Sequence, residues 1–469
     1  MSTILTSRET ALPTPPAGVF SPSFAAASIG MLALISILAF EQLAVATVMP
    51  GVAAALNDSS LYAAAFGAAV AAGIVGMVAA GHWCDRAGPA TPMTAGAALF
   101  VLGLVLAGFA PDMRWLVAGR ALQGGGGGLM SVALYVVVGR HYPAALHPRI
   151  FAAFAGAWVV PAIVGPALAG LIARHLGWRW VFLAAALLTV PAWLLLQRGL
   201  AALPAAPAAR DARAPARREI VAAVGAAVSA ALLYAGGQSL AWRTLGLGAL
   251  ALAGLALFAP RLLPAGTLRG APGLPAVVAL RGLVAANFFA AEVFLPLLLS
   301  TERGLSAVQA GLVLTLGALG WSAGSWWQGR EGRARDDAAC VHRLRTGLGM
   351  MGGGTLVVVL ALLPALPDAT AVAVTVAGWV IAGTGIGLSF PTLSVLALRF
   401  APAEAQGRAS SALQLADSLF SAVGLAFAGA LLAALQPQAP RAAFAAGLAL
   451  AASLSLVGMG LASRARRAH

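Results

Sequence analysis

Residues 81–89 read Gly81-His82-Trp83-Cys84-Asp85-Arg86-Ala87-Gly88-Pro89, and this short polar segment separates two long apolar stretches. The stretch before it covers 61–81 and the stretch after it covers 93–110. A helix needs about 20 predominantly apolar residues to cross a bilayer. The segment is therefore predicted to connect two membrane-spanning helices.

The composition of the whole chain agrees with this interpretation. Of its 469 residues, 60% are hydrophobic and 9% are charged, whereas a soluble domain carries about a quarter charged residues. All 29 basic residues are arginine, so the chain lacks the lysine of a P-loop ATPase or a Schiff-base enzyme. We expect a polytopic membrane protein that is not an enzyme and holds no cofactor or metal.

The apolar stretches predict an all-α protein of two helix bundles with fourteen membrane-spanning helices, or twelve if 220–240 and 243–260 form one re-entrant hairpin. They fall at roughly 24–50, 61–81, 93–110, 114–140, 149–173, 179–198, 220–240, 243–260, 276–300, 306–328, 344–365, 370–399, 406–434 and 441–463. We divide the chain into an N-terminal tail (1–22), a six-helix bundle (23–198), a linker (199–219), an inserted helix pair (220–262), a second six-helix bundle (263–463) and a C-terminal tail (464–469).

The arginine distribution predicts the orientation. Cytoplasmic loops of membrane proteins are rich in Lys and Arg, and most of the 29 arginines fall on the cytoplasmic side if both termini are cytoplasmic. The exceptions are Arg114, Arg174, Arg179, Arg243, Arg303 and Arg441 outside, and Arg120 within a helix. Because the arginines are scattered over short loops, the net charge of +14 does not indicate nucleic-acid binding. The stretch before Ser23 lacks the features of a signal peptide.

Four charged residues are predicted to lie well inside the membrane: Glu41, Glu292, Asp417 and Arg120. Such residues are costly and usually face a cavity or a charged partner. Glu41 and Glu292 occupy similar positions in the first helix of each bundle, before Pro50 and Pro296. Each acid is a candidate for proton binding or, alternatively, for packing alone. Asp417 lies nearer the cytoplasmic end and could be a gate contact, and Glu41 and Arg120 could form either an exchangeable or a fixed ion pair.

Glycine runs and aromatic residues have simpler explanations. Gly124 to Gly128 lie inside a predicted helix without the strand and lysine of a phosphate loop. They are predicted to allow close helix packing, as are Gly383, Gly385 and Gly387. Phe288 and Phe289 precede Glu292 by one helical turn and share its face, which makes them candidate substrate contacts.

The segment at 81–89 resembles the cytoplasmic gate motif of the major facilitator superfamily, and the chain is most similar to its fourteen-spanner drug:proton antiporters. The motif residues are Gly81, Asp85, Arg86 and Gly88. Asp85 can pair with an arginine or a helix N-terminus across the seam between bundles, and Gly88 permits a tight turn. The basic residues that usually follow are replaced by Pro89 and Ala90.

Three further stretches carry the same resemblance. Arg120-Ala121-Leu122-Gln123-Gly124 is similar to the fourth-helix motif, whose Arg the family uses in proton transfer. Residues 161–170 look like the fifth-helix antiporter motif, with Pro161, Gly165, Pro166 and Gly170 as its flexing positions. Glu41 and the residues up to Pro50 resemble the first-helix motif, with Glu where Asp is commoner.

The resemblance implies the major facilitator fold of two six-helix bundles, here with an inserted helix pair, and a proton-coupled exporter of hydrophobic or cationic small molecules that works by alternating access. Glu41, Glu292, Arg120 and Asp417 would couple the proton, and Phe288, Phe289 and Gln123 would contact substrate. The partners would be protons, a small-molecule substrate and the bilayer of a bacterial inner membrane, with the protein a monomer. Two alternatives are open: an exporter of lipid or glycolipid, and a non-transporting membrane scaffold. The membrane subunit of an ATP-driven pump is disfavoured because the chain has no cytoplasmic coupling domain.

Overall fold

The computed structural model describes residues 18–58, 61–202, 217–236, 242–330, 336–435 and 438–466. Within these ranges every regular element is helical, as the composition predicts. The helices of the N-terminal part are α1 (Ala25–Ala55), α2 (Tyr62–Ala87), α3 (Ala90–Gly108), α4 (Met113–His141), the short η1 (Ala144–Leu146), α5 (His147–Gly156), α6 (Val159–His175) and α7 (Arg179–Ala201).

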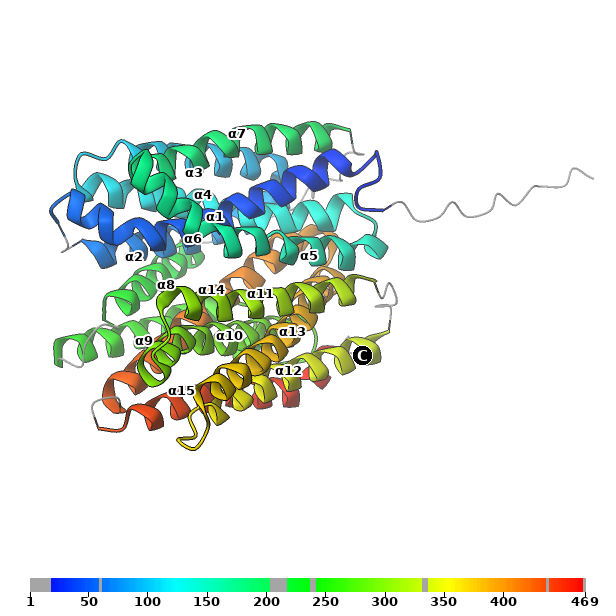
Figure 1. The fold of residues 1–469 in the computed structure, drawn as a ribbon. Coiled ribbons are helices and arrows are strands. Elements are labelled where there is room, and N and C mark those ends of the chain that lie inside the picture. The colour runs from blue at the N-terminus through cyan, green and yellow to red at the C-terminus, as the bar shows by residue number, and fades with distance from the viewer. Residues whose placement is uncertain are drawn as a thin grey trace, which may run out of the picture.

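The rest of the chain contributes a helix pair and a second group of helices. The pair is α8 (Arg217–Gly236) and α9 (Trp242–Leu262). After η2 (Thr267–Arg269) come α10 (Leu274–Arg303), α11 (Ala307–Arg330), α12 (Asp337–Leu360), α13 (Asp368–Phe400), η3 (Ala403–Ala405), α14 (Gln406–Leu435), α15 (Pro440–Leu461) and η4 (Ala462–Arg464). In Figure 1, α1 to α7 form the upper part of the molecule and α10 to α15 the lower part.

Ten stretches of the described residues are long and apolar enough to cross a membrane. One of them joins α5 and α6 (Ala144–His175), and α9 adds a shorter apolar stretch at Gly246–Leu262. The count of fourteen spans, and the arrangement as two six-helix bundles with an inserted pair, stay predictions. The predicted tail 1–22 and linker 199–219 lie mostly outside the described residues.

Buried apolar side chains form two clusters, one for each part of the chain. The first contains residues between Val19 and Leu200, together with Val395 and Leu398 from the end of α13. The second contains residues from Ala223 to Ala465, together with Ile74 and Val78 from α2. The two parts therefore share apolar packing near the ends of α2 and α13.

The helix predicted over 149–173 is interrupted, and this corrects the sequence-based prediction. Pro161 has no N–H to donate to the carbonyl of Ala157, and its ring would clash with that carbonyl in a regular helix. The chain accordingly turns at residues 157–158 between α5 and α6. The hydroxyl of Ser36 on α1 donates to the freed Ala157 carbonyl at 2.8 Å. The break is thus tied to α1, five residues from Glu41.

The glycine run of α4 lets three helices approach one another closely, as predicted. A Cβ atom on Gly124 would lie 2.0 Å from the Ala69 carbonyl oxygen of α2, and one on Gly126 would lie 2.4 Å from the Phe100 nitrogen of α3. Gly125 differs, because its Cβ would meet no atom within 3.8 Å. The same close packing holds for Gly383, Gly385 and Gly387 of α13, which lie against carbonyls of α11 and α12.

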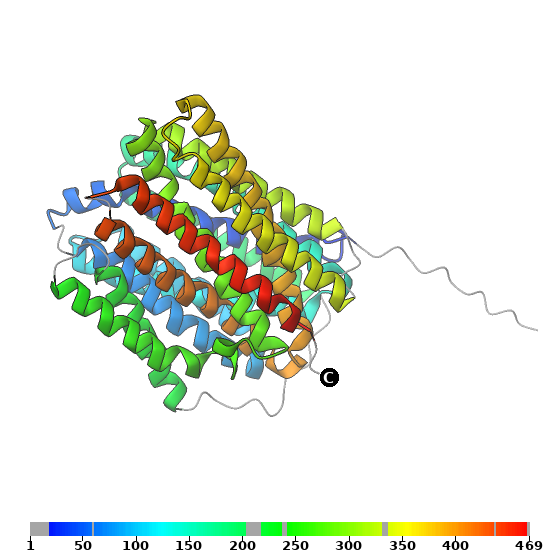
Figure 2. The same cartoon turned by 90° about the horizontal axis from the view of Figure 1, so that it is seen from below.

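Helices α8 and α9 pack on each other and against both parts of the molecule. Their contacts run to α2 in the N-terminal part and to α14 in the C-terminal part, and Figure 2 shows them at one edge of the molecule beside these helices. Gly254 of α9 fits against Ser229 of α8, and Gly67 of α2 fits against Ala231 of α8. The pair therefore bridges the seam between the two parts.

Gly124 and Gly125 offer a matched pair of substitutions for testing this packing. Gly124→Ala should lower protein stability by roughly 1–3 kcal/mol, because the new methyl group forces α2 and α4 apart. Gly125→Ala adds the same helix propensity in open space, so it should be neutral or stabilising by about 0.5–1 kcal/mol. Thermal unfolding of the two purified variants in detergent measures both effects. Equal midpoints would contradict the proposed backbone contact.

Candidate functional site

A buried charged cluster joins α1, α2 and α4. The guanidinium of Arg120 donates to the carboxylate of Glu41, to the Gln123 side-chain oxygen at 2.7 Å, and to the Ala65 carbonyl at 3.4 Å. All three charged or amide side chains are buried. Gln123 is thus a hydrogen-bond partner of Arg120. The predicted contact of Gln123 with substrate stays a prediction.

Glu292 lies near the middle of α10 and differs from the other embedded acids. Its side chain is half-buried, and no residue that the structure describes forms a hydrogen bond or ion pair with it. Asn287, five residues earlier, fixes α10 to α15 by donating to the Ala451 carbonyl at 2.6 Å and to Ser455 Oγ at 2.7 Å. The helix around Glu292 is therefore held in place while its carboxylate has no described partner.

The aromatic residues beside Glu292 divide into a buried and an accessible one. Phe288 is buried and stacks on Trp379 with ring centroids 4.5 Å apart, and Trp321 meets it edge-on at 5.3 Å. Phe289 is half-buried and touches only the edge of Phe288 among the ring contacts of described residues. Of the two predicted substrate contacts, Phe289 is therefore the one with exposed surface.

A second buried ion pair contains an arginine that the sequence analysis did not single out as a site residue. Arg281 on α10 is 3% exposed and donates to the Asp417 carboxylate of α14 at 2.7 Å. Its guanidinium also lies 3.5 Å from the ring centre of Phe390 and within 3.5 Å of the Tyr135 hydroxyl on α4. Arg281 is thus a second buried, ion-paired arginine within a helix, in addition to Arg120. Its position within the predicted span 276–300 was the sequence feature that could have indicated a buried arginine in this helix.

The predicted gate residue Asp85, at the end of α2, bridges to the start of α14. Its carboxylate accepts from the backbone N–H of Gly407 at 2.7 Å and of Arg408 at 3.2 Å, and from Arg408 Nε at 3.3 Å. Arg140 of α4 lies 3.8 Å away on the other side. The charged partners of Asp85 are therefore Arg408 and Arg140, which the sequence analysis did not assign to the gate.

The other motif residues of this segment have distinct positions. Gly81 packs where a Cβ would lie 2.8 Å from Ser411 Cβ of α14, so only glycine permits this approach. Gly88 ends α2 with a φ of 77°, which favours glycine. Arg86 is exposed at the end of α2, so its predicted part in the gate stays a prediction.

The fifth-helix motif faces α1 through only part of its length. Pro161 and Gly165 are buried, and a Cβ on Gly165 would lie 3.5 Å from Phe40, the neighbour of Glu41. Pro166 is half-buried and Gly170 is exposed. The first half of the motif is thus the half that packs beside the charged cluster of α1.

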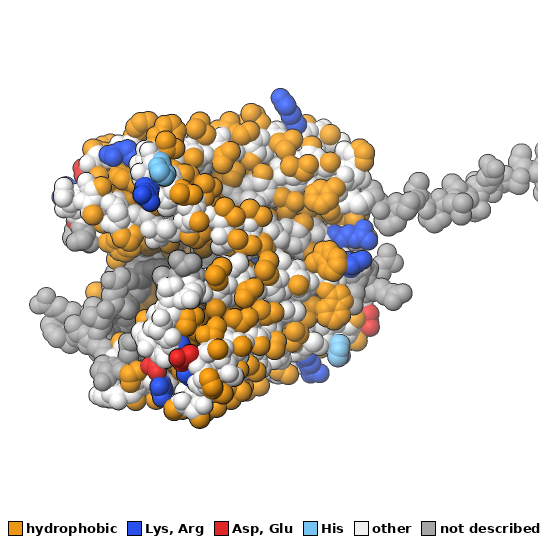
Figure 3. Space-filling view, in the orientation of Figure 1, with side chains coloured by type: hydrophobic (Ala, Val, Ile, Leu, Met, Phe, Trp, Pro, Cys, Tyr) orange, Lys and Arg blue, Asp and Glu red, His pale blue; other side chains and the backbone are white. Residues whose placement is uncertain are grey.

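Hydrogen bonds across the seam gather at one end of the molecule. Besides the Asp85 contacts, the Ser411 hydroxyl donates to the Met77 carbonyl at 2.8 Å, and the Gln414 amide lies 3.5 Å from the Ser131 carbonyl. We call this region, where α2 and α13 end and α14 begins, the closed end. At the opposite end, Figure 3 shows the surface hollowed between the two parts.

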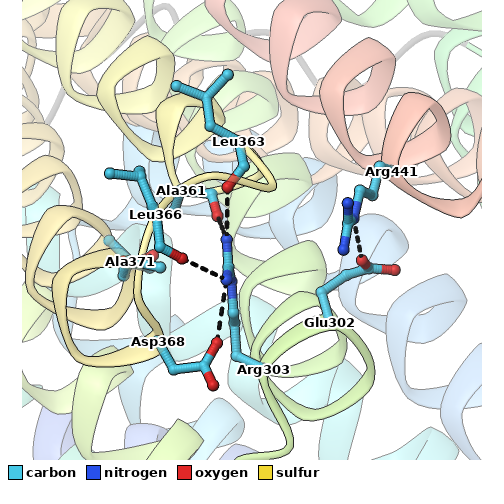
Figure 4. Close-up of polar contacts among 9 residues, drawn as sticks. Glu302, Arg303, Ala361, Leu363, Leu366, Asp368, Ala371 and Arg441 are labelled. Atoms are coloured by element: carbon cyan, nitrogen blue, oxygen red, sulfur yellow. Dashed lines mark hydrogen bonds and ion pairs between the residues drawn. The ribbon is translucent and has the colours of Figure 1, made fainter.

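At that opposite end, two adjacent residues of α10 tie the C-terminal helices together. Glu302 accepts from Arg441 of α15 at 2.7 Å, and Arg303 donates to the Asp368 carboxylate of α13 at 3.0 Å (Figure 4). Arg303 also donates to the backbone carbonyls of Ala361, Leu363 and Leu366. The C-terminal part is therefore braced within itself, while the side-chain hydrogen bonds across the seam between described residues lie at the closed end.

An all-helical fold with apolar spans and buried charge pairs on both sides of a seam defines a membrane carrier. The family model of the Major Facilitator Superfamily matches residues 24–425. The chain belongs to this superfamily, whose members are non-enzymatic carriers that bind small molecules in a membrane.

Relatives and solved structures agree with this assignment. A probable multidrug-efflux transporter of Mycobacterium tuberculosis (strain H37Rv) is 27% identical over 84% of this chain and 85% of its own length. The multidrug transporter protein MdtP of Bacillus subtilis is 25% identical over 75% and 65%. The human organic anion transporter MFSD10 has the same fold, with a TM-score of 0.67 and 14% identity over 94% of this chain and 99% of that one.

The pair of Arg281 and Asp417 should behave as one unit in a double-mutant cycle. Asp417→Asn leaves a guanidinium buried without its counter-ion, which should cost roughly 3–5 kcal/mol. Adding Arg281→Gln removes that charge, so the double variant should be more stable than the single Asp417→Asn variant. Thermal unfolding in detergent compares the three proteins.

The exposed pair of Glu302 and Arg441 is the matched control for this cycle, because its coupling should not exceed about 1 kcal/mol. If the changes in unfolding free energy caused by Asp417→Asn and Arg281→Gln were additive, the two side chains would not be energetically coupled, and the prediction would be wrong.

Proposed function

We propose that the chain is a proton-coupled antiporter that exports hydrophobic or cationic small molecules by alternating access. The observation that carries the proposal is the state of Glu292. Among the three embedded acids, Glu41 and Asp417 each contact an arginine, whereas Glu292 contacts no described charged or hydrogen-bonding group. A carboxyl group without a partner at this depth is stable when it binds a proton or a cation.

This chemistry supports competition between proton and substrate at Glu292. A proton from outside would neutralise the carboxylate and displace a cationic substrate, and loss of that proton to the cytoplasm would restore the binding charge. Phe289, one turn away with exposed surface, offers an apolar contact for the same substrate. Hydrophobic cations fit such a site because their charge pairs with the carboxylate of Glu292 and their apolar groups pack against Phe289.

The cluster of Glu41 and Arg120 supports a coupling role in the N-terminal part. When Glu41 takes a proton, Arg120 loses its counter-ion but keeps the side-chain oxygen of Gln123 and the carbonyl of Ala65 as acceptors. The arginine can therefore stay in place while its carboxylate partner changes charge.

The closed end supports alternating access, with this structure closed on the side of Asp85. Gate opening would break the contacts of Asp85 with Gly407 and Arg408, and the turn between α5 and α6 offers a point at which the N-terminal part can flex. The proposed orientation has the closed end and both termini in the cytoplasm of a bacterium, in its inner membrane. The relatives named as multidrug-efflux transporters support the substrate class.

Inside-out vesicles test the proposal with Glu292→Gln. An acid-inside pH gradient is imposed, a fluorescent dye reports it, and a panel of lipophilic cations is added. We expect at least one cation to collapse the gradient in vesicles with the wild-type protein. The Glu292→Gln variant should lose this response at unchanged expression, because glutamine cannot exchange a proton.

Glu302→Gln is the matched control, because this acid also lies on α10 but is paired with Arg441; it should keep the response. Undiminished efflux by Glu292→Gln would reject the role of Glu292. A silent panel combined with transfer of labelled lipid between leaflets by the purified protein would favour a lipid exporter instead.

A further inference from the structure

A cavity of about 320 Å³ lies at the closed end, between the inserted helix pair and the gate. Its walls come from α2, α8, the end of α9, the start of α10 and the start of α14. The cavity therefore touches the N-terminal part, the C-terminal part and the helix pair at once. None of the residues in the proposed transport site lines it.

The cavity has a charged side and an apolar side. The charged groups that line it are His82, Glu219, Arg261 and Arg408, and the remaining wall is mostly apolar, with Val78, Leu262, Leu263, Pro264, Leu274 and Leu415. His82 and Glu219 pair with each other at 3.3 Å. The two arginines thus leave an excess of positive charge next to an apolar wall.

Both arginines have donors to spare. Arg408 uses its Nε for Asp85, and Arg261 uses one Nη for the Leu257 carbonyl, while no other hydrogen bond of either side chain to a described residue is present. Both residues are exposed. A guanidinium group with free N–H donors binds phosphate oxygens through charge-assisted hydrogen bonds.

The position of the cavity favours a lipid head group as the source of a phosphate ligand. Five helices end or begin around it: α2 ends at Ala87, α9 ends at Leu262, α8 begins at Arg217, α10 begins at Leu274 and α14 begins at Gln406. Helix ends lie at the level of the lipid head groups in a membrane protein. The outer face of α8 beside the cavity is apolar and exposed, at Ile220, Val221, Val224 and Val228, and can carry acyl chains.

We propose that this cavity binds the phosphate head group of an anionic phospholipid through Arg261 and Arg408, with the acyl chains along α8. Basic pockets between membrane helices on the cytoplasmic side are suited to such head groups. The inserted pair α8–α9 then has a role, since it supplies Arg261, Glu219 and the apolar surface of this site.

The lipid would also act on the gate. Opening of the closed end separates α2 from α14, which pack on each other and both line the cavity. Arg408 lies on α14, whereas Arg261 lies on the pair α8–α9, which packs mainly on α2. A head group held by both arginines therefore joins the two sides of the gate and binds the closed arrangement better than an open one, which stabilises it. Because Arg408 contacts Asp85 and lines the cavity, the head group and the gate share one guanidinium.

The test uses the purified full-length protein in nanodiscs of phosphatidylcholine, with and without phosphatidylglycerol. We expect phosphatidylglycerol to raise the thermal unfolding midpoint and native mass spectrometry to detect the retained anionic lipid. Arg261→Gln should bind that lipid about fivefold more weakly, the loss expected for one basic residue at a membrane surface. Arg198→Gln, which changes another exposed arginine in the last turn of a helix, should behave like the wild type.

Three results would overturn the proposal. Arg261→Gln could bind phosphatidylglycerol as tightly as the wild type, or phosphatidylcholine could stabilise the protein equally well. Alternatively, inorganic phosphate added to phosphatidylcholine discs could reproduce the whole shift, which would assign the cavity to a free anion. The readout is lipid binding rather than transport, so its outcome does not depend on the proposed proton coupling.

Discussion

A charge that is removed from water inside a membrane needs a partner, and this constraint organises the structure. Arg120 is neutralised by Glu41, Arg281 by Asp417, and Arg140 lies beside Asp85. Each pair joins different helices, so satisfying the charges also fixes how α1, α2, α4, α10 and α14 sit together. Glu292 is the embedded acid without a described partner, and it is the one to which the proposed chemistry assigns proton and substrate.

Polar contacts within each part of the molecule can be distinguished from those across the seam between the parts. Within the C-terminal part, Arg303 and Glu302 brace the C-terminal end of α10, and Asn287 fixes its middle to α15. Across the seam, the hydrogen bonds of the closed end involve backbone groups, buried side chains such as Asp85 and Ser411, and the exposed Arg408. Rigid halves with a weaker contact between them are what a rocking transport cycle requires. The inserted pair touches both halves, so it can influence that motion.

Much of this architecture could be predicted from local sequence. The apolar stretches identified the helices, because hydrophobic length is a property of contiguous residues. The glycines of α4 were correctly interpreted as packing positions, and a helix N-terminus was anticipated as a partner for Asp85, which accepts from the Gly407 N–H. The turn between α5 and α6 was missed, although Pro161 was the residue to suggest it.

The partners of the charged residues could not be predicted in the same way. Asp417 and Arg281 are 136 residues apart, and Asp85 lies 323 residues from Arg408. Arg281 was not paired with Asp417 in the sequence analysis because sequence position reports depth along a helix but not the direction in which a long side chain extends. The sequence could not show that Phe288 is buried while Phe289 keeps exposed surface. Phe288 is covered by Trp321 and Trp379 from other helices, and these contacts cannot be read from the local sequence.

The sequence by itself therefore determined the class of protein, the approximate helix positions and the acids to which the proposed chemistry is assigned. These features depend on hydrophobic length, charge in apolar context and local motif. Only the tertiary structure decided which acid has no described partner, which arginines lie beside Asp85 and where the helix pair forms a cavity. Those features depend on contacts between helices distant in the chain, because packing geometry brings their side chains within a few ångströms of one another.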